Sequence, residues 1–507
     1  MKPEELQGEH MEVVKSDDGG IREVRPVITN ADDRRIRRKT DKYILSILVW
    51  VYFLQILDKS VLGYGSLFGL QQDTGLKGTQ YSWVGSMAPI AQLVWLPLSS
   101  WLIVKVPPRI LMSVLVLGWG AAQTCMAAAH NFSGLAATRF FLGLFEAACL
   151  PLFSVLTSQW YRRKEQPVRV ACWYGTNGLA TMIGSALSYG LGRIPSSSLR
   201  SWQIIFLFVG LVTVITAPFV YWKLDNNINE ARFLTEQEKL QATERLRSNN
   251  TGLATSEFKW SHVREVFLDL KTYLWFFMAL LLNVGASVSN VFGPLILSGL
   301  GYDKYITSLL NIPFGAVQLL IILISSYAAQ KAKLKGLILA LLILPVVVGL
   351  VVLYTLPRSR TAPNLVAYYL LACLFGGNPL IVTWIVANTA GTTKKSVLMV
   401  IYNIGSSAGN IIGPLLFKAQ DAPAYLPGLK VTLALFVSLV AVILATWALL
   451  IVLNKGQERK RLAAGKEAHV TDYSMTDRFE VNEAEMEDHG RADDLTDRKN
   501  EDFIYLY

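Results

Sequence analysis

Arg139 and Glu146 are the only charged residues between positions 134 and 160, and their spacing would allow them to act together on a ligand. Residues seven apart lie on one face of a helix, about two turns apart. That separation is too long for a simple direct ion pair and leaves room for a ligand between the two groups. An Arg guanidinium can donate two parallel hydrogen bonds to a carboxylate, and a partly buried Glu can titrate near neutral pH. The pair therefore predicts an anion site beside a proton site, unless each residue pairs with a different helix.

A second pair of opposite charges, Asp58 and Lys59, interrupts the apolar run 43–64. A charge at the centre of a bilayer costs about 2.5–3.5 kcal/mol on insertion scales and usually faces the protein interior. Adjacent residues lie about 100° apart on a helix, so one faces the interior while the other pairs with a neighbouring helix. We assign Asp58 to proton coupling and Lys59 to gating or packing. A purely structural role for both is the alternative.

The second half of the chain has amides where the first half has charges. Amides hydrogen-bond a polar solute without the solvation cost of a charge. Eight fall in apolar runs: Asn283, Asn290, Asn311, Gln318, Asn378, Asn388, Asn403 and Asn410. The candidates for substrate binding are Asn283, Asn388, Asn403 and Asn410, with Tyr402 as an aromatic partner for a flat solute. Hydrogen bonds between helices, and interfacial anchoring for the tyrosine, are the alternatives.

Long apolar runs must position these residues. The chain has 507 residues, of which 52% are hydrophobic and 17% are charged, whereas soluble domains carry about 25% charged residues. Each run is long enough to cross about 30 Å of hydrocarbon as a helix. We predict an all-α membrane protein with twelve spans, at 43–64, 80–103, 110–129, 134–160, 169–192, 203–222, 272–293, 306–328, 336–356, 363–388, 397–416 and 430–453.

Lys and Arg gather in alternate connections, and cytoplasmic loops hold the excess of these residues. The basic side has clusters at 34–39, 162–164, 331–335, 394–395 and 459–461. Both termini are therefore expected in the cytoplasm. The formal net charge of +10 fits this bias and contact with lipid. A nucleic-acid partner is not expected, because the sequence has no basic stripe with interleaved aromatic residues.

Six spans on each side of a central hydrophilic segment is the plan of transporters whose halves rock about a midplane site. We predict a disordered cytoplasmic N-terminal tail (1–42), a six-helix half (43–222), a cytoplasmic linker (223–271), a second six-helix half (272–454) and an acidic cytoplasmic tail (455–507). Within the last tail, residues 467–507 are expected to be disordered. Thr235 and Glu238 form a capping-box pattern that predicts a surface helix in the linker. Neither tail can reach a midplane site, so loss of residues 1–35 and 467–507 is expected to leave transport near normal.

Small residues recur every four positions in two spans. They are Gly184, Ser188 and Gly192 in the fifth span and Gly405, Gly409 and Gly413 in the eleventh. Small residues on one face let helices approach closely. Because the two spans occupy equivalent places in the two halves, the pattern indicates a duplicated architecture, or else ordinary packing at unrelated places. A larger residue at Gly409 is expected to wedge the halves apart.

Motifs across residues 43–453 are specific when taken together. They lie at 57–64, 80–83, 139–151, 292–294, 299–302, 384–395, 402–414 and 421–425. In these residues the chain resembles the major facilitator superfamily and, within it, the fungal anion:cation symporters typified by the allantoate permease. The resemblance implies alternating access and proton-driven import of a small organic anion, such as a ureide, a carboxylate vitamin or a short peptide. It also implies a plasma-membrane address, and we expect a monomer whose partners are substrate, proton and lipid.

Three departures from the family pattern bear on this expectation. Lys105 stands where the superfamily usually has an acid before its loop motif, which puts that gating interaction in question. The stretch 87–92 replaces an aromatic-rich run, so the substrate can differ from that of relatives. The fifth span lacks the Gly-Pro pair of drug antiporters, which favours symport.

Other functions remain open at this point. The runner-up is export of a fungal secondary metabolite, and a third hypothesis is a nutrient sensor that binds solute without transporting it. An enzyme is not expected, because no phosphate-binding loop, nucleophile elbow or metal-ligand cluster is present. The four cysteines, at 125, 149, 172 and 373, fall inside predicted spans without metal-like spacing. No cofactor and no metal are expected.

Overall fold

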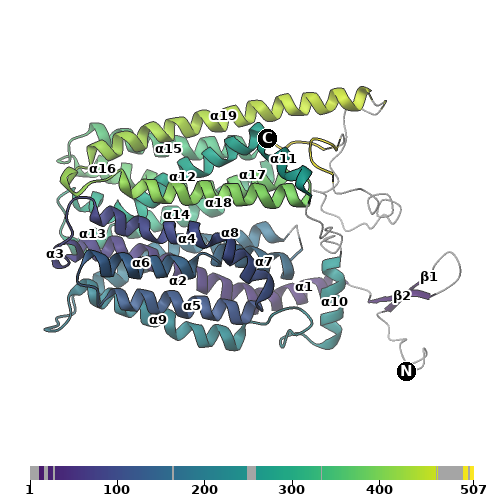
Figure 1. The fold of residues 1–507 in the computed structure, drawn as a ribbon, viewed down its shortest axis with the longest axis horizontal. Helices are drawn as coiled ribbons and strands as arrows, with labels where there is room; N and C mark the ends of the chain where they lie inside the picture. The colour runs from purple at the N-terminus through teal and green to yellow at the C-terminus, as the bar shows by residue number, and fades with distance from the viewer. Residues whose placement is uncertain are drawn as a thin grey trace.

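The computed structural model describes residues 11–15, 21–26, 29–162, 165–247, 259–332, 334–463, 465, 495–500 and 503–507. Within them, two sets of six membrane-length helical segments form one elongated bundle (Figure 1). The first set is α2 (Ser46–Leu67), α4 (Gln80–Lys105), α5 (Pro108–Met126), α6 (Phe132–Glu146) with α7 (Cys149–Trp160), α8 (Gln166–Leu191) and α9 (Ser201–Lys223). A short α3 (Leu70–Asp73) follows α2.

The second set completes the fold. It is α12 (Leu270–Ser298), α13 (Lys304–Leu309) with α14 (Asn311–Ala332), α15 (Lys335–Thr355), α16 (Thr361–Leu370) with the 3-10 helix η4 (Leu371–Gly376) and α17 (Gly377–Ala387), α18 (Thr392–Leu415) and α19 (Leu426–Ala463). A single 3-10 turn, η5 (Ala419–Asp421), precedes α19. The twelve predicted spans coincide with these segments, except that α19 continues ten residues past the predicted end at 453. Lys, Gln, Glu and Arg are good helix formers, so the helix persists beyond the apolar run.

Ten of these segments are apolar and long enough to cross a membrane by composition alone. The other two, α4 and α8, have 26 residues each but carry more Ser, Gly, Thr and Gln. They lie at equivalent inner places, where each packs against a helix of the other half: α4 against α18, and α8 against α14. Their polarity reflects that interior position, because helices surrounded by protein need fewer apolar side chains than helices facing lipid.

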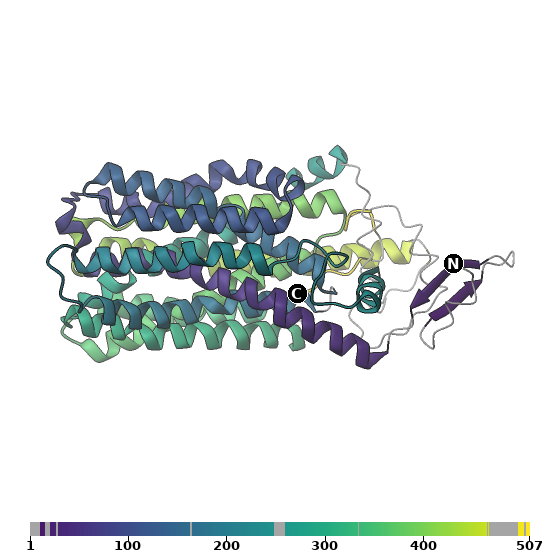
Figure 2. The same ribbon diagram turned by 90° about the horizontal axis from the view of Figure 1, so that it is seen from below.

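Both chain ends and the linker lie at one end of the bundle, which we call the terminal end; the opposite end is the far end (Figures 1 and 2). α1 (Asn30–Thr40) runs through a π-helical turn, η2 (Asp41–Leu45), into α2. The linker holds α10 (Glu236–Arg247), capped by Thr235 and Glu238 as predicted, and α11 (Trp260–Phe267). A separate two-stranded antiparallel sheet is formed by β1 (Met11–Lys15) and β2 (Ile21–Pro26).

The expectation of disordered tails is wrong for residues 30–40, 495–500 and 503–507. α1 is held to the linker by charge, since Lys39 lies 2.7 Å from Glu238 on α10. The last residues pack against the second half through buried contacts that are described below. Polar composition suggested disorder, but these charges find partners far away in sequence. Other tail residues, 41–42 and 455–463, belong to helices, and the remaining tail lies outside the described residues apart from the sheet and single positions.

The glycine motif on α18 faces its own half. A Cβ at Gly409 would overlap the backbone oxygen of Leu280 on α12, and a Cβ at Gly405 would lie 2.7 Å from the backbone oxygen of Phe276. In the first half, Gly184 on α8 faces α2 in the equivalent way, 3.0 Å from Leu57. The motif therefore joins equivalent helices within each half. The expectation that a larger residue at Gly409 would wedge the halves apart is wrong, because the neighbour is α12.

We predict that Gly409→Ala destabilises the second half, since the new methyl group would overlap backbone atoms that cannot move aside. Strain of this kind costs about 1–3 kcal/mol. The measurement is the thermal unfolding midpoint of the purified protein in detergent. Gly190→Ala is the matched control, because nothing lies within 4 Å of its new Cβ. Equal midpoints for both variants would contradict the prediction.

The halves are joined at the far end and in the middle. Tyr81 and Ser82 on α4 donate to the backbone oxygens of Val291 (2.9 Å) and Phe417 (2.6 Å). Ser308 on α13 donates to the backbone oxygen of Ser185 on α8 at 2.9 Å. In the middle, the Ser86 hydroxyl donates to the backbone oxygen of Ile411 at 2.8 Å, and the Thr181 hydroxyl donates to the Gln318 side-chain oxygen at 3.1 Å. The far end is therefore held closed by contacts between the halves in this structure.

Candidate functional site

Arg139 and Glu146 owe their positions to a broken helix. The Asn131 side chain caps α6 by accepting from the Gly134 N–H at 2.8 Å. α6 ends at Glu146, and α7 begins three residues later with Pro151 in its first turn. A proline lacks an N–H and clashes with the carbonyl four residues before it, so Pro151 interrupts the helix next to Glu146. Glu146 thus stands at the break, two turns beyond Arg139.

Glu146 is buried among residues of two other helices. The Gln92 amide on α4 donates to Oε2 of Glu146 at 2.9 Å, and the Lys59 ammonium on α2 lies 3.5 Å from the same oxygen. Oε1 is buried without a hydrogen-bond partner within the described residues. A buried carboxylate normally fills its acceptor positions. One oxygen of Glu146 is therefore open to a proton.

Arg139 is 3% exposed and makes no hydrogen bond or ion pair within the described part of the chain. The carboxylates of Glu146 and Asp58 act on it electrostatically from beyond ion-pair distance. A buried charge without a partner is destabilising by several kcal/mol. Within the described residues no negative group contacts Arg139, so its position suits the binding of an anion.

The two charges of α2 point in different directions. Asp58 is fully buried, and its Oδ2 accepts from the Thr213 hydroxyl on α9 at 3.3 Å. The Lys59 side chain keeps 29% of its surface exposed, although almost all of α2 is buried, and it turns toward Glu146. Asp58 thus pairs with a neighbouring helix, and Lys59 joins the charged group of Arg139 and Glu146. Lys59 contacts a carboxylate on a neighbouring helix, and the gating or packing role assigned to it from the sequence stays a prediction.

The second half contributes neutral groups from a second broken helix. η4 interrupts the tenth span just before Asn378, and Pro379 follows Asn378 in the first turn of α17. Asn378 and Asn283 exchange amide hydrogen bonds of 3.1 and 3.2 Å, and the Tyr402 hydroxyl donates to Asn378 at 2.9 Å. Three helices, α12, α17 and α18, therefore meet in one polar cluster at the level of the break.

Sequence reasoning missed Asn378 and Gln92 as site residues. A signal for Asn378 was available, because the fourth and tenth spans each contain a proline-interrupted segment in corresponding places of the two halves. Such pairs point to the binding site in transporters with repeated halves. Gln92 had no comparable signal, since an isolated amide in a span is usually a contact between helices.

The structure places the remaining candidates for substrate binding in different surroundings. Asn388 is fully buried at the terminal end, where its amide accepts from the Leu506 N–H at 2.7 Å and donates to the Leu506 oxygen at 2.9 Å. Its hydrogen-bonding capacity is used by the chain itself, so it does not belong with the other substrate candidates. Asn410 donates to Ser406 on its own helix at 3.0 Å, and Asn403 is half-buried on the same helix. No metal-binding group of His, Cys, Asp and Glu occurs in the part of the chain that the structure describes.

The sequence pattern of the Major Facilitator Superfamily matches residues 48–414. An uncharacterized transporter of Schizosaccharomyces pombe is 35% identical over 80% of this chain and 76% of its own length. A thiamine pathway transporter of Saccharomyces cerevisiae is 31% identical over 93% of this chain and 86% of its own length. The allantoate permease of the same yeast is 27% identical over 86% and 82% of the two chains.

Solved structures show the same fold at low identity. An inward-facing bacterial homologue of the human lysosomal transporter Spinster aligns with a TM-score of 0.59 at 16% identity, over 83% of this chain and 98% of its own. A D-xylose-proton symporter aligns with a TM-score of 0.61 at 12% identity, over 80% and 96%. These similarities establish the arrangement of the twelve spans and leave the solute to be argued from the site.

Proposed function

This chain belongs to the Major Facilitator Superfamily, and from that premise we propose that it moves a small organic anion together with protons. It is an integral membrane transporter related to fungal permeases, and its family and relatives are transporters and not enzymes. The observation that carries the proposal is Arg139, a buried cation that lacks a partner among the described residues and lies in the interior beside Glu146 and Lys59.

The broken helices suggest how the solute is held. Arg139 would bind the carboxylate through two parallel hydrogen bonds, a geometry that a guanidinium provides. The cluster of Asn283, Asn378 and Tyr402 would hydrogen-bond the polar body of the solute from the other half. A solute bound to both groups would bridge the two halves, as alternating access about a midplane site requires.

Glu146 supports the coupling to protons. Its charge attracts the Lys59 ammonium across 3.5 Å, and protonation removes that attraction. Lys59 would then be free to turn toward the bound anion. One proton on Glu146 would in this way raise the affinity for a negative solute, which is the linkage that a symporter needs.

The orientation follows from the basic loops. We infer that both termini are cytoplasmic, so the terminal end opens to the cytoplasm in this structure, and we infer import across the plasma membrane. The name of one relative, the allantoate permease, points to a carboxylate, whereas that of the thiamine pathway transporter names a pathway and not a solute. The unpaired guanidinium of Arg139 favours the carboxylate.

The test is solute-induced proton movement in proteoliposomes that contain the full chain. Addition of allantoate or a similar ureido carboxylate is expected to carry protons inward, detected by an internal pH dye. The neutral amide of the same acid and thiamine are the controls, and neither is expected to move protons. Proton movement that is equal for acid and amide, or transport of thiamine alone, would overturn the proposal.

A further inference from the structure

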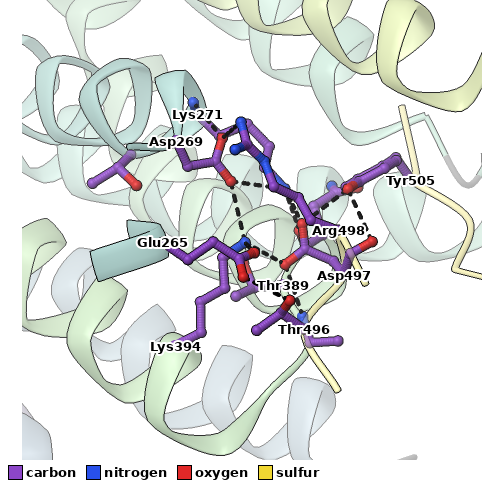
Figure 3. A network of polar contacts seen from close by, with 12 residues as sticks. Glu265, Asp269, Lys271, Thr389, Lys394, Thr496, Asp497, Arg498 and Tyr505 are labelled. Atoms are coloured by element: carbon purple, nitrogen blue, oxygen red, sulfur yellow. Dashed lines mark hydrogen bonds and ion pairs between the residues drawn. The ribbon is translucent and has the colours of Figure 1, made fainter. Parts of the chain in front are cut away.

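The last residues of the chain are packed against the terminal end of the second half, where they contact residues of α12, α17, α18 and α19 (Figures 1 and 3). Thr496 and Asp497 are fully buried, and Tyr505 is 2% exposed. This depth is unusual for a segment joined to α19 only through the polar stretch 464–494. We call residues 495–507 the C-terminal segment.

Ionic contacts form the core of this packing. Asp497 binds the Lys271 ammonium through Oδ2 and lies 2.8 Å from the Lys394 ammonium through Oδ1. The Tyr505 hydroxyl donates to the same carboxylate at 2.9 Å, and its ring lies 4.4 Å from the Lys271 ammonium. Figure 3 shows these groups converging from the C-terminal segment, α12 and α18.

Main-chain contacts fix the final residues. Besides its exchange with Asn388, the Leu506 oxygen accepts from the Trp384 indole at 2.9 Å. Asn454 on α19 exchanges two hydrogen bonds, of 2.8 and 2.9 Å, with the backbone of Tyr505. Side-chain amides that pair with the main chain of an extended segment are a common means of binding a peptide.

The docking site balances its charges without the C-terminal segment. Lys394 also lies 2.8 Å from Glu265 and 3.2 Å from Asp269, and Lys271 lies 3.6 Å from Asp269. Removal of the segment therefore leaves two ammonium groups facing two carboxylates. Removal therefore leaves no uncompensated buried charge of the kind that would be strongly destabilising. This site can be empty as well as filled.

The docked segment also holds parts of the second half that face the terminal end. It fixes the loop between α17 and α18 through Asn388 and through the Ala390 N–H, which lies 3.4 Å from Asp497. It fixes α11 through Thr496, whose hydroxyl donates to Glu265 at 2.8 Å. This end must close against the first half during alternation, and the structure with the segment docked has the far end closed. A ligand that prefers one state shifts the population toward that state.

We propose that the C-terminal segment is a reversible intramolecular ligand of this site, and that docking holds the transporter in the state with its terminal end open. Because the segment belongs to the same chain as its site, docking is intramolecular, so a modest intrinsic affinity can keep it docked. Release of the segment frees the α17–α18 loop and α11 for closure.

The test compares Asp497→Asn with Lys499→Ala in the full chain. Asp497 is at the ionic core, whereas Lys499 is exposed, and each change removes one charge. Carboxypeptidase should release Tyr507 about tenfold faster or more from Asp497→Asn than from the unchanged protein. Lys499→Ala should match the unchanged protein. Equal release from all three would overturn reversible docking, and this readout needs no knowledge of the solute.

A second measurement tests the conformational effect. Spin labels at the exposed residues Trp222 on α9 and Leu337 on α15 report the distance between the halves at the terminal end. Asp497→Asn is expected to increase the population with the shorter distance, and Lys499→Ala is not. An added peptide with the sequence of residues 495–507, at millimolar concentration, should restore the longer distance. Unchanged distances despite faster Tyr507 release would overturn the effect on the state.

The charge on Asp497 determines the pH range in which both measurements should be made. Burial alone would raise the pKa of its carboxyl, but Lys271 and Lys394 outweigh burial and hold that pKa below its ordinary value. The contribution of Asp497 to docking is therefore present above about pH 3.9, the unfolded value, and is lost only as the pH falls further. The charge on Asp497 should therefore not change between about pH 5.5 and 7.5, which is on the order of the range used to impose proton gradients.

Discussion

Arg139→Lys is expected to raise the solute concentration needed for half-maximal uptake by about tenfold to a hundredfold, although the charge is kept. Lysine has a compact ammonium in place of the planar guanidinium, so it cannot form two parallel hydrogen bonds with a carboxylate. Loss of one charge-assisted hydrogen bond corresponds to about 1.5–3 kcal/mol. The measurement is the initial rate of labelled allantoate uptake into proteoliposomes across a range of concentrations.

Arg360→Lys is the control for that result. Arg360 is exposed at the far end and begins α16, so the same chemical change there should leave the uptake curve unaltered. Protein amounts in the vesicles must be matched by immunoblotting. If Arg139→Lys transports with the original concentration dependence, Arg139 is a structural residue and the anion site lies elsewhere.

Glu146→Gln is expected to abolish accumulation driven by a pH gradient while solute exchange continues. Gln mimics the protonated acid permanently, so the site can bind the anion in both orientations without releasing a proton. Its oxygen can still accept from Gln92, which preserves local packing. Counterflow and gradient-driven uptake, measured on the same proteoliposomes, separate exchange from coupling.

Glu236→Gln provides the matched comparison, because that side chain is 89% exposed on α10 and lies outside the membrane-spanning segments. It should show normal counterflow and normal accumulation. Normal accumulation by Glu146→Gln under a pH gradient would refute the assignment of the coupling proton. Asp58, which is fully buried against Thr213, would then be the next residue to test.

The twelve-span fold was predictable because lipid leaves few choices. In a bilayer every backbone polar group must be satisfied internally, so an apolar run of about 20 residues has to be a helix. The spacing of Arg139 and Glu146 was also readable, since both lie on one helix. Even the break between α6 and α7 has a local cause in Pro151. Local chemistry determines these features, so the sequence reveals them.

Other parts of the site depend on packing that no local pattern records. Which of Asp58 and Lys59 faces the interior is set by the rotation of α2 against its neighbours. Asn378 and Asn388 lie at the two ends of one helix, α17, and have the same chemistry, yet one meets Asn283 and Tyr402 while the other binds Leu506. The second contact joins residues more than a hundred positions apart, so polar composition of the tail gave no sign of it.

The two proline-broken spans divide the chemistry between the halves. Charged side chains gather at the break in the fourth span, and amides and a phenol gather at the corresponding break in the tenth. A duplicated scaffold has thus specialised, so selection can act on one copy without disturbing the other. If the proposed function holds, mutations around Asn283, Asn378 and Tyr402 should retune which solute is accepted, while the proposed proton coupling at Glu146 and Lys59 stays intact. Directed evolution of new selectivity should therefore begin in the second half.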